Sequence, residues 1–221
     1  MANLKRAAAL ALSAAMFLQP MTASAVTWGN VVQAIKNYSR GQTDFQEVSG
    51  ETEGETTWIQ VDADGKATIK GGTITGGVMV GGAPSAPKLA DDIYGLIFKN
   101  VTIKESNDEG LGDYSVYVSI FGKSGIKEIT FDEDTTVQGN VMISAFKDTQ
   151  VSNAGMMEKM LQVDALDGAT VNNENTGTVV GEFRGSAQGE GSKMTLTNQG
   201  TVEDALDGFS LGEGATTTIT N

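Results

Sequence analysis

The chain has 221 residues, with 15 Lys and Arg against 28 Asp and Glu, which gives a net charge of −13. It contains neither Cys nor His, so disulfides, thiolate chemistry and every catalytic arrangement with a histidine base are excluded. The acidic charge also argues against nucleic acid as a partner, because phosphate binding requires the opposite sign.

Residues 1–25 have the pattern of a bacterial export signal. Lys5 and Arg6 precede an apolar run of about 12 residues, too short to span a bilayer, and Ala23 and Ala25 stand where a signal peptidase would cut before Val26. Only two basic residues and no acidic one lie in this segment, so the remainder has a net charge of −15. We therefore predict a cleaved signal peptide and an exported protein.

Helical spacing opens the exported chain and gives way to strand spacing. Apolar residues recur at i, i+3, i+4 and i+7, which predicts a short amphipathic helix within 28–40. These residues are Trp28, Val31, Val32, Ile35 and Tyr38. The chain is then polar and acidic up to residue 57, so we predict a cap helix and a loop over 26–57. From Trp58 the period is two, which predicts strands.

Turn residues separate the short strands that follow. The stretch "DADG" at Asp62–Gly65 predicts a hairpin or a solenoid corner, since the further ligands of a calcium loop are missing. Gly pairs recur at a fixed spacing over 71–82 and predict tight corners, because glycine adopts positive φ readily. Pro84 and Pro87 mark residues 82–93 as a protruding loop.

The last third of the chain repeats with a regular period. Four strand ends contain an aliphatic residue, a spacer and an asparagine, and these recur every ~20 to 25 residues. The four are Val151–Asn153, Val171–Asn173, Leu196–Asn198 and Ile219–Asn221. Such a period predicts a β-solenoid over 58–221, with about seven to nine coils stacked at about 4.8 Å. The aliphatic residues should form an inward column, and the asparagines a hydrogen-bonded one.

The pentapeptide DALDG occurs twice, at Asp164–Gly168 and at Asp204–Gly208, which raises the question of a paired carboxylate site. The first copy begins farther along the chain from its strand-end asparagine, Asn153, than the second begins from Asn198. The two copies are therefore out of register and should not form a stacked carboxylate cluster. We predict a structural role for them.

The register of the second copy follows from a shared G-T-V-x5-G pattern, which begins at Gly177 and again at Gly200. Aligned on this pattern, Asp204 falls opposite Gly181, and Asp207 falls opposite Arg184. Leu206 falls opposite Phe183 as the inward residue. An Asp207–Arg184 pair on the surface would contribute only about 0–1 kcal/mol. No catalytic, metal or cofactor-binding residue is assigned, and the ligand-binding residues are left open.

The export signal, the absence of Cys and the acidic Gly/Thr/Asn composition resemble the passenger regions of Gram-negative autotransporters and related outer-membrane adhesins. The resemblance is carried by "ATVNNENTGTV" (Ala169–Val179), "KMTLTNQGTV" (Lys193–Val202) and "ATTTITN" (Ala215–Asn221). It implies a single-stranded right-handed parallel β-helix, displayed at or shed from the cell surface. It also implies adhesion or aggregation through a repetitive face, with a host or bacterial surface glycan or protein as partner, and self-association along the rod. It transfers no functional residue.

The chain departs from this family in one respect. Autotransporter passengers are followed by a membrane β-barrel, and no alternating barrel strands occur up to Asn221, where the sequence stops within the repeat pattern. We expect a truncated product, a fragment, or a passenger exported by a separate partner. Association with the outer membrane would then depend on that missing translocator.

The sequence leaves two alternative functions open. A polysaccharide-degrading lyase or glycosidase could use Asp132, Glu133 and Asp134 as its carboxylates. Lys127 or Arg184 would supply the cation, although the net charge opposes an acidic polysaccharide. A phage tail-spike or surface-layer component would have the same β-helical pattern.

Overall fold

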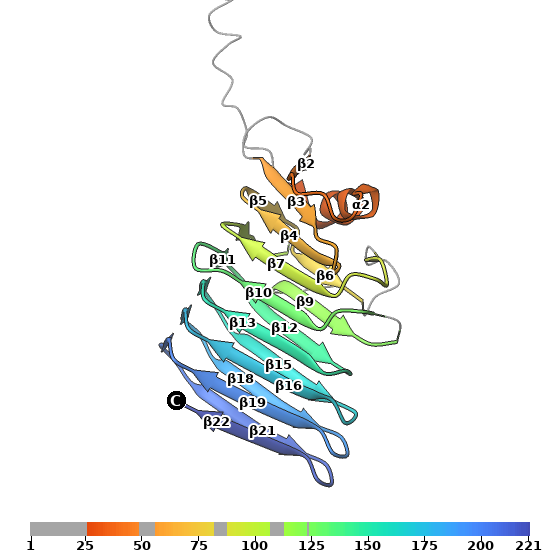
Figure 1. Cartoon of the computed structure of the whole chain (residues 1–221). Coiled ribbons are helices and arrows are strands. Elements are labelled where there is room, and N and C mark those ends of the chain that lie inside the picture. Colours follow the sequence, from red (N-terminus) through yellow and green to blue (C-terminus); the bar gives the residue numbers. More distant parts are fainter. Residues whose placement is uncertain (1–25, 49–55, 82–87, 107–112, 123) are drawn as a thin grey trace, which may run out of the picture.

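The computed structural model describes residues 26–48, 56–81, 88–106, 113–122 and 124–221. The expected signal peptide and residues 82–87 of the expected loop lie outside this part. The described chain winds into a solenoid of parallel β-strands, with one short helix at the end where it starts (Figure 1). The prediction of an all-β solenoid is confirmed.

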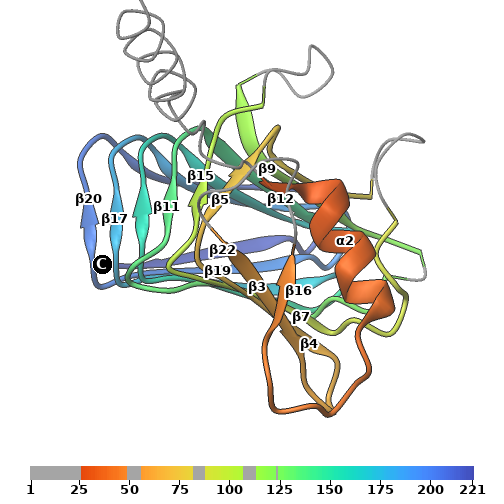
Figure 2. The ribbon, with the colours of Figure 1, turned by 90° about the horizontal axis from the view of Figure 1, so that it is seen from above.

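Three sheets of described strands form the sides of the coil, as the view along the axis shows (Figure 2). The seven-stranded sheet contains β1 (Val26–Thr27), β5 (Thr73–Thr75), β8 (Thr102–Ile103), β11 (Thr136–Val137), β14 (Met156–Met157), β17 (Thr178–Val179) and β20 (Thr201–Val202). The nine-stranded sheet contains β2 (Gln46–Val48), β3 (Thr57–Val61), β4 (Lys66–Lys70), β7 (Gly95–Lys99), β10 (Glu128–Phe131), β13 (Thr149–Asn153), β16 (Thr170–Asn175), β19 (Lys193–Asn198) and β22 (Thr216–Thr220). The six-stranded sheet contains β6 (Val78–Val80), β9 (Tyr114–Ile120), β12 (Asn140–Ala145), β15 (Leu161–Leu166), β18 (Phe183–Gln188) and β21 (Leu206–Leu211).

The coils differ in length between the two halves of the rod. Lys66 pairs with Gly95, and Gly95 pairs with Glu128, so the first two coils are longer than those that follow. From Glu128 onward, paired positions in the nine-stranded sheet are 22 or 23 apart. Because the early coils are long, the described strands form no more than six complete coils, which corrects the expected seven to nine.

Helix α2 (Trp28–Asn37) lies at the starting end of the rod. Thr27 caps it: the Thr27 side chain accepts from the backbone N–H of Asn30, and the Asn30 side chain accepts from the backbone N–H of Thr27. The apolar face of the helix is buried in the core, where Trp28 Nε1 donates to the carbonyl of Met79 at 2.7 Å. The helix ends earlier than predicted, because the backbone is already extended at Tyr38.

The nine-stranded sheet begins with antiparallel strands, since β3 pairs antiparallel with both β2 and β4. The stretch "DADG" forms the β3–β4 turn, which selects the hairpin from the two predicted alternatives. Asp62 Oδ1 accepts from the backbone N–H of Lys66 at 2.8 Å, and Gly65 has a φ of 79°. The Asp62 carboxylate therefore stabilises a turn.

One inward column of the nine-stranded sheet changes its chemistry along the axis. Its members, in order, are Ile69, Phe98, Phe131, Asn153, Asn175 and Asn198. The two phenylalanine rings stack with centroids 5.3 Å apart. Each asparagine then donates from Nδ2 to Oδ1 of the next at 2.8 Å, and Asn198 donates in the same way to Asn221. An aromatic stack is thus continued by an amide ladder.

The ladder contains Asn175 in place of Asn173, which corrects the predicted asparagine column. Asn173 lies instead between Val151 and Leu196, in the neighbouring inward column. It is fully buried, and neither its amide nitrogen nor its amide oxygen has a hydrogen-bond partner. Val171 is displaced in the same way: it pairs with Thr149, and not with Val151 as predicted.

A glycine stands two positions after each of three ladder asparagines, and close backbone approach is what requires it. A Cβ on Gly177 would lie closer than 3.0 Å to the carbonyl oxygen of Gly155, a contact that Cβ atoms essentially never make. A Cβ on Gly200 would meet the carbonyl oxygen of Gly177 in the same way. None of the three has a positive φ. The predicted use of positive φ is confirmed elsewhere, at the corner glycines Gly71, Gly72, Gly76, Gly77 and Gly81.

Replacing the two inward asparagines of β16 should have opposite effects. Asn173→Val should raise the free energy of unfolding by about 1–3 kcal/mol, because it removes a buried amide without partners. Asn175→Val should lower it by a similar or larger amount, because it removes the acceptor of Asn153 Nδ2 and the donor to Asn198 Oδ1 in a buried setting. Thermal and urea unfolding of the two variants measure both effects. Equal destabilisation by both would contradict the assigned register.

The glycine column gives a second prediction. Gly177→Ala should cost about 3 kcal/mol, the upper part of the range for overpacking, because its Cβ meets backbone that cannot move without separating two coils. Gly191→Ala is the matched control: this glycine has a φ of 71° but open space around it. The control should cost about 1–2 kcal/mol through backbone strain alone. Urea unfolding should rank the variants in this order, and the reverse order would refute the steric explanation.

Candidate functional site

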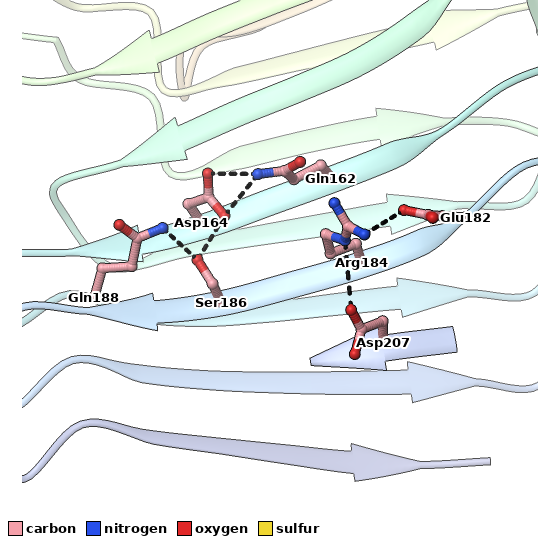
Figure 3. A network of polar contacts seen from close by, with 7 residues as sticks. All are labelled: Gln162, Asp164, Glu182, Arg184, Ser186, Gln188 and Asp207. Atoms are coloured by element: carbon pink, nitrogen blue, oxygen red, sulfur yellow. Dashed lines mark hydrogen bonds and ion pairs between the residues drawn. The ribbon is translucent and has the colours of Figure 1, made fainter. Parts of the chain in front are cut away.

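The outward face of the six-stranded sheet carries a polar network around Asp164 (Figure 3). Asp164 Oδ1 accepts from Ser186 Oγ at 2.6 Å, and its two carboxylate oxygens accept from Gln162 Nε2 at 3.2 and 3.0 Å. Gln188 Nε2 donates to the same Ser186 Oγ at 2.8 Å. These hydrogen bonds join β15 to β18.

Asp164 belongs to an outward row of small polar side chains and is only 3% exposed. The row consists of Ser119, Ser144, Asp164 and Ser186. A carboxylate enclosed in this way cannot reach a substrate in solution. Its hydrogen bonds to Ser186 and Gln162 therefore give it a structural role between neighbouring coils.

The second DALDG copy has a different conformation from the first. Asp204 is exposed ahead of β21, and Asp207 lies within that strand, whereas Asp167 of the first copy has a φ of 50° in the turn after β15. Asp207 pairs with Arg184 as predicted, with 3.6 Å between the carboxylate and Nε, and Arg184 also contacts Glu182 at 2.6 Å (Figure 3). The copies are out of register, so they form no joint carboxylate site.

The acidic triplet proposed for a polysaccharide-degrading enzyme lies in the turn after β10. Asp132 Oδ1 accepts from the backbone N–H of Asn100 at 3.0 Å and from Thr135 Oγ1 at 2.9 Å, so this carboxylate holds the corner together. Lys127 precedes β10, whereas the triplet follows it, so the whole strand of about 13 Å separates them. Arg184 belongs to the six-stranded sheet. The structure does not bring the triplet and its proposed cations together.

A cavity of about 370 Å³ adjoins this turn. Its lining includes Asp132 and Glu133 from the triplet, together with Lys99 and Glu174 from other coils. Sequence reasoning missed Lys99 and Glu174 because they are distant in the chain. The signal for Glu174 was the regular period, which stacks it on the residues of β13 beside the turn.

Two outward rows of polar side chains run along the regular coils of the nine-stranded sheet. One consists of Glu128, Gln150, Asn172, Thr195 and Thr218, and the other of Thr130, Ser152, Glu174, Thr197 and Thr220. Each of these side chains is at least partly exposed. We call these side chains together the polar rows. In earlier coils the rows are interrupted by Gly95 and Ile97.

Ion pairs hold charged side chains on this surface and beside the seven-stranded sheet. Lys66 Nζ lies 2.5 Å from the Glu128 carboxylate because Gly95, which stands between them in the row, has no side chain. This hydrogen bond and the accompanying charge attraction raise the pKa of Lys66. Lys159 and Glu105 form a similar pair at 2.5 Å, which raises the pKa of Lys159. Both pairs are substantially exposed, so they add little stability.

In the described ranges, no group of three or more acidic side chains is placed to hold a metal ion. No helix within them has both the length and the apolar character needed to cross a membrane. No family model, curated protein or solved structure matches the chain. What the structure shows is a β-solenoid fold.

The two DALDG copies allow a matched test of the structural role. Asp164→Ala should lower the free energy of unfolding by about 1–3 kcal/mol, because Gln162 and Ser186 lose their acceptor in a buried setting. Asp204→Ala, the same substitution in the same pentapeptide, should change it by less than about 0.5 kcal/mol, because Asp204 is exposed. Urea unfolding compares the two. Equal effects of the two substitutions would contradict the structural role of the buried Asp164 carboxylate.

Proposed function

We propose that this chain is an extracellular β-solenoid surface protein of the autotransporter-passenger kind, which promotes adhesion or aggregation through the polar rows. The observation that supports this most directly is the uninterrupted run of polar side chains over five successive strands of one sheet. Such an array offers many equivalent contacts on one rigid face, whereas the acidic triplet lies apart from Lys127 and Arg184, the cations proposed for an enzyme.

Stacking gives the polar rows their binding capacity. Neighbouring coils place equivalent side chains about 4.8 Å apart, in an order that the backbone hydrogen bonds enforce. Single hydrogen bonds to a partner surface are weak, but a second contact on the same rigid body forms at high effective concentration. A repetitive partner, such as a surface polymer or another rod, would engage several coils at once.

The proposed location is the cell surface of a Gram-negative bacterium, after export through the signal at residues 1–25. The pattern of that segment, the absence of Cys and the acidic composition support this location. Mass spectrometry of the secreted product tests it, and the expected amino terminus is Val26.

Adhesion can be tested with beads coated with the purified chain, scored for clumping and for attachment to bacterial and epithelial cells. The double variant Thr195→Lys, Thr197→Lys should reduce adhesion about tenfold, because it inserts two long cations into the polar rows and disrupts several contacts together. The matched control is Thr178→Lys, Thr201→Lys, which adds the same charge to the outward face of the seven-stranded sheet. The control should adhere like the natural chain.

Two results would count against the proposal. If the natural chain neither clumps beads nor attaches them to cells, the adhesion function is wrong. If both double variants lose adhesion equally, charge alone explains the loss and the polar rows are not the adhesive face. Thermal unfolding of each variant confirms that the solenoid is intact.

A further inference from the structure

Exposed aromatic side chains gather at the corner where the chain passes from the six-stranded to the nine-stranded sheet. Tyr94 precedes β7, Phe121 follows β9 and Phe146 follows β12, with exposed fractions of 45%, 49% and 38%. Phe121 and Phe146 contact each other edge to face, with ring centroids 6.4 Å apart. Aromatic surface left in water at one place is typical of a binding site, because burial there is favourable only once a partner arrives.

The backbone of two neighbouring coils holds the Tyr94 ring in place. The Tyr94 N–H donates to the carbonyl of Gly65 at 2.8 Å, and the Tyr94 carbonyl accepts from the N–H of Lys127 at 2.8 Å. A Cβ added to Gly65 would lie 3.0 Å from one ring carbon, and one added to Gly125 would lie 3.3 Å from another. The ring therefore occupies space that two glycines leave free, and almost half of its surface faces solvent.

Tyr94 borders a cavity of about 530 Å³, within the 300–1,000 Å³ of small-ligand sites. The other polar lining side chains include Asp91, Asp148, Lys127 and Lys147. The Lys147 side chain is held in place because its Nζ donates to the carbonyls of Gly122 and Ser124 at 2.6 and 3.0 Å. Asp148 Oδ1 accepts from the backbone N–H of Thr170 at 2.8 Å. Two of the charged groups are thus oriented by the fold.

The charges of the lining select a class of ligand. Two carboxylates and two ammonium groups cancel, while the whole chain has a net charge of −13 and repels acidic polymers. Carboxylates accept and ammonium groups donate, which suits hydroxyl groups that do both. An aromatic ring beside them suits the apolar C–H face of a pyranose. An uncharged sugar matches all three features.

We propose that this corner is a binding site for an uncharged hexose glycan, with Tyr94 as the stacking platform and Asp91, Asp148, Lys127 and Lys147 as its hydrogen-bonding groups. The site rests on the proposed adhesive function and narrows its partner to a glycan chain. It is separate from the polar rows, which lie on the outward face of the nine-stranded sheet.

Saturation-transfer NMR and calorimetry test the site with the purified chain and five probes: maltohexaose, cellohexaose, mannohexaose, N-acetylchitohexaose and hexagalacturonate. At least one of the four neutral oligomers should bind, and hexagalacturonate should bind more weakly than that oligomer. Tyr94→Ala should weaken the binding about tenfold through loss of the stacked ring. Tyr94→Phe keeps the ring and should stay within about threefold of the natural chain.

Phe209→Ala serves as the control, because Phe209 is a similarly exposed aromatic residue on β21, away from this corner. It should leave binding unchanged, and thermal unfolding should show all three variants folded. Binding of no neutral oligomer, tighter binding of hexagalacturonate, or equal binding by Tyr94→Ala would each overturn the proposal. If glycan binding fails while coated beads still adhere, the glycan site is wrong and the adhesive function stands. If a glycan binds but the beads do not adhere, the glycan site stands and the adhesive function is wrong.

Discussion

Close approach of the backbone between successive coils is the constraint on which the rest of this structure depends. It is tightest at the glycines after the ladder asparagines, where the carbonyl oxygen of Gly155 occupies the place that a Cβ of Gly177 would need. The N–H of Thr178 donates to that same oxygen at 2.9 Å. A side chain at Gly177 would separate these groups and move every residue stacked above. These corners therefore keep neighbouring coils at the separation that the strand pairing of the inward columns and polar rows requires.

The asparagine ladder and the phenylalanine stack occupy different parts of the same inward column, because they differ in how exactly neighbouring coils must be aligned. An amide bonded at both ends needs its neighbours at fixed height and rotation, whereas stacked rings tolerate offsets. The asparagines accordingly occur where successive ladder positions are 22 or 23 apart. Phe98 and Phe131 occur where the coils are longer and less regular. The regularity of the coil and the chemistry of its core therefore change together.

The periodicity was enough to predict the solenoid, the glycine corners and the Arg184–Asp207 register, because each depends on a motif that recurs in the chain. It did not distinguish Asn173 from Asn175, since both face inward in "VNNEN" and both follow a spacer. The spacing from asparagine to glycine would have decided, because only Asn175 has a glycine two positions later, as Asn153 and Asn198 do. The number of coils was wrong because the long early coils lack this motif. The cavity beside the β10 turn and the Tyr94 corner were not predicted, since their linings come from several coils and only Glu174 belongs to the regular period.

The two halves of the rod differ in the surfaces that they present, and the length of the coil is the physical reason. In a short coil, strands and corners take up almost the whole chain and leave little for longer loops. The surface of the regular half therefore consists mainly of outward strand side chains, among them the polar rows. A long coil contains extra residues, and those between β9 and β10 contribute Ser124, Gly125 and Lys127 to the cavity beside Tyr94. Identical pentapeptides illustrate the converse: DALDG is enclosed between coils at Asp164 and exposed at Asp204 because coil position, and not the motif, decides what a side chain meets. Function in this chain is therefore to be sought in what stacking brings together.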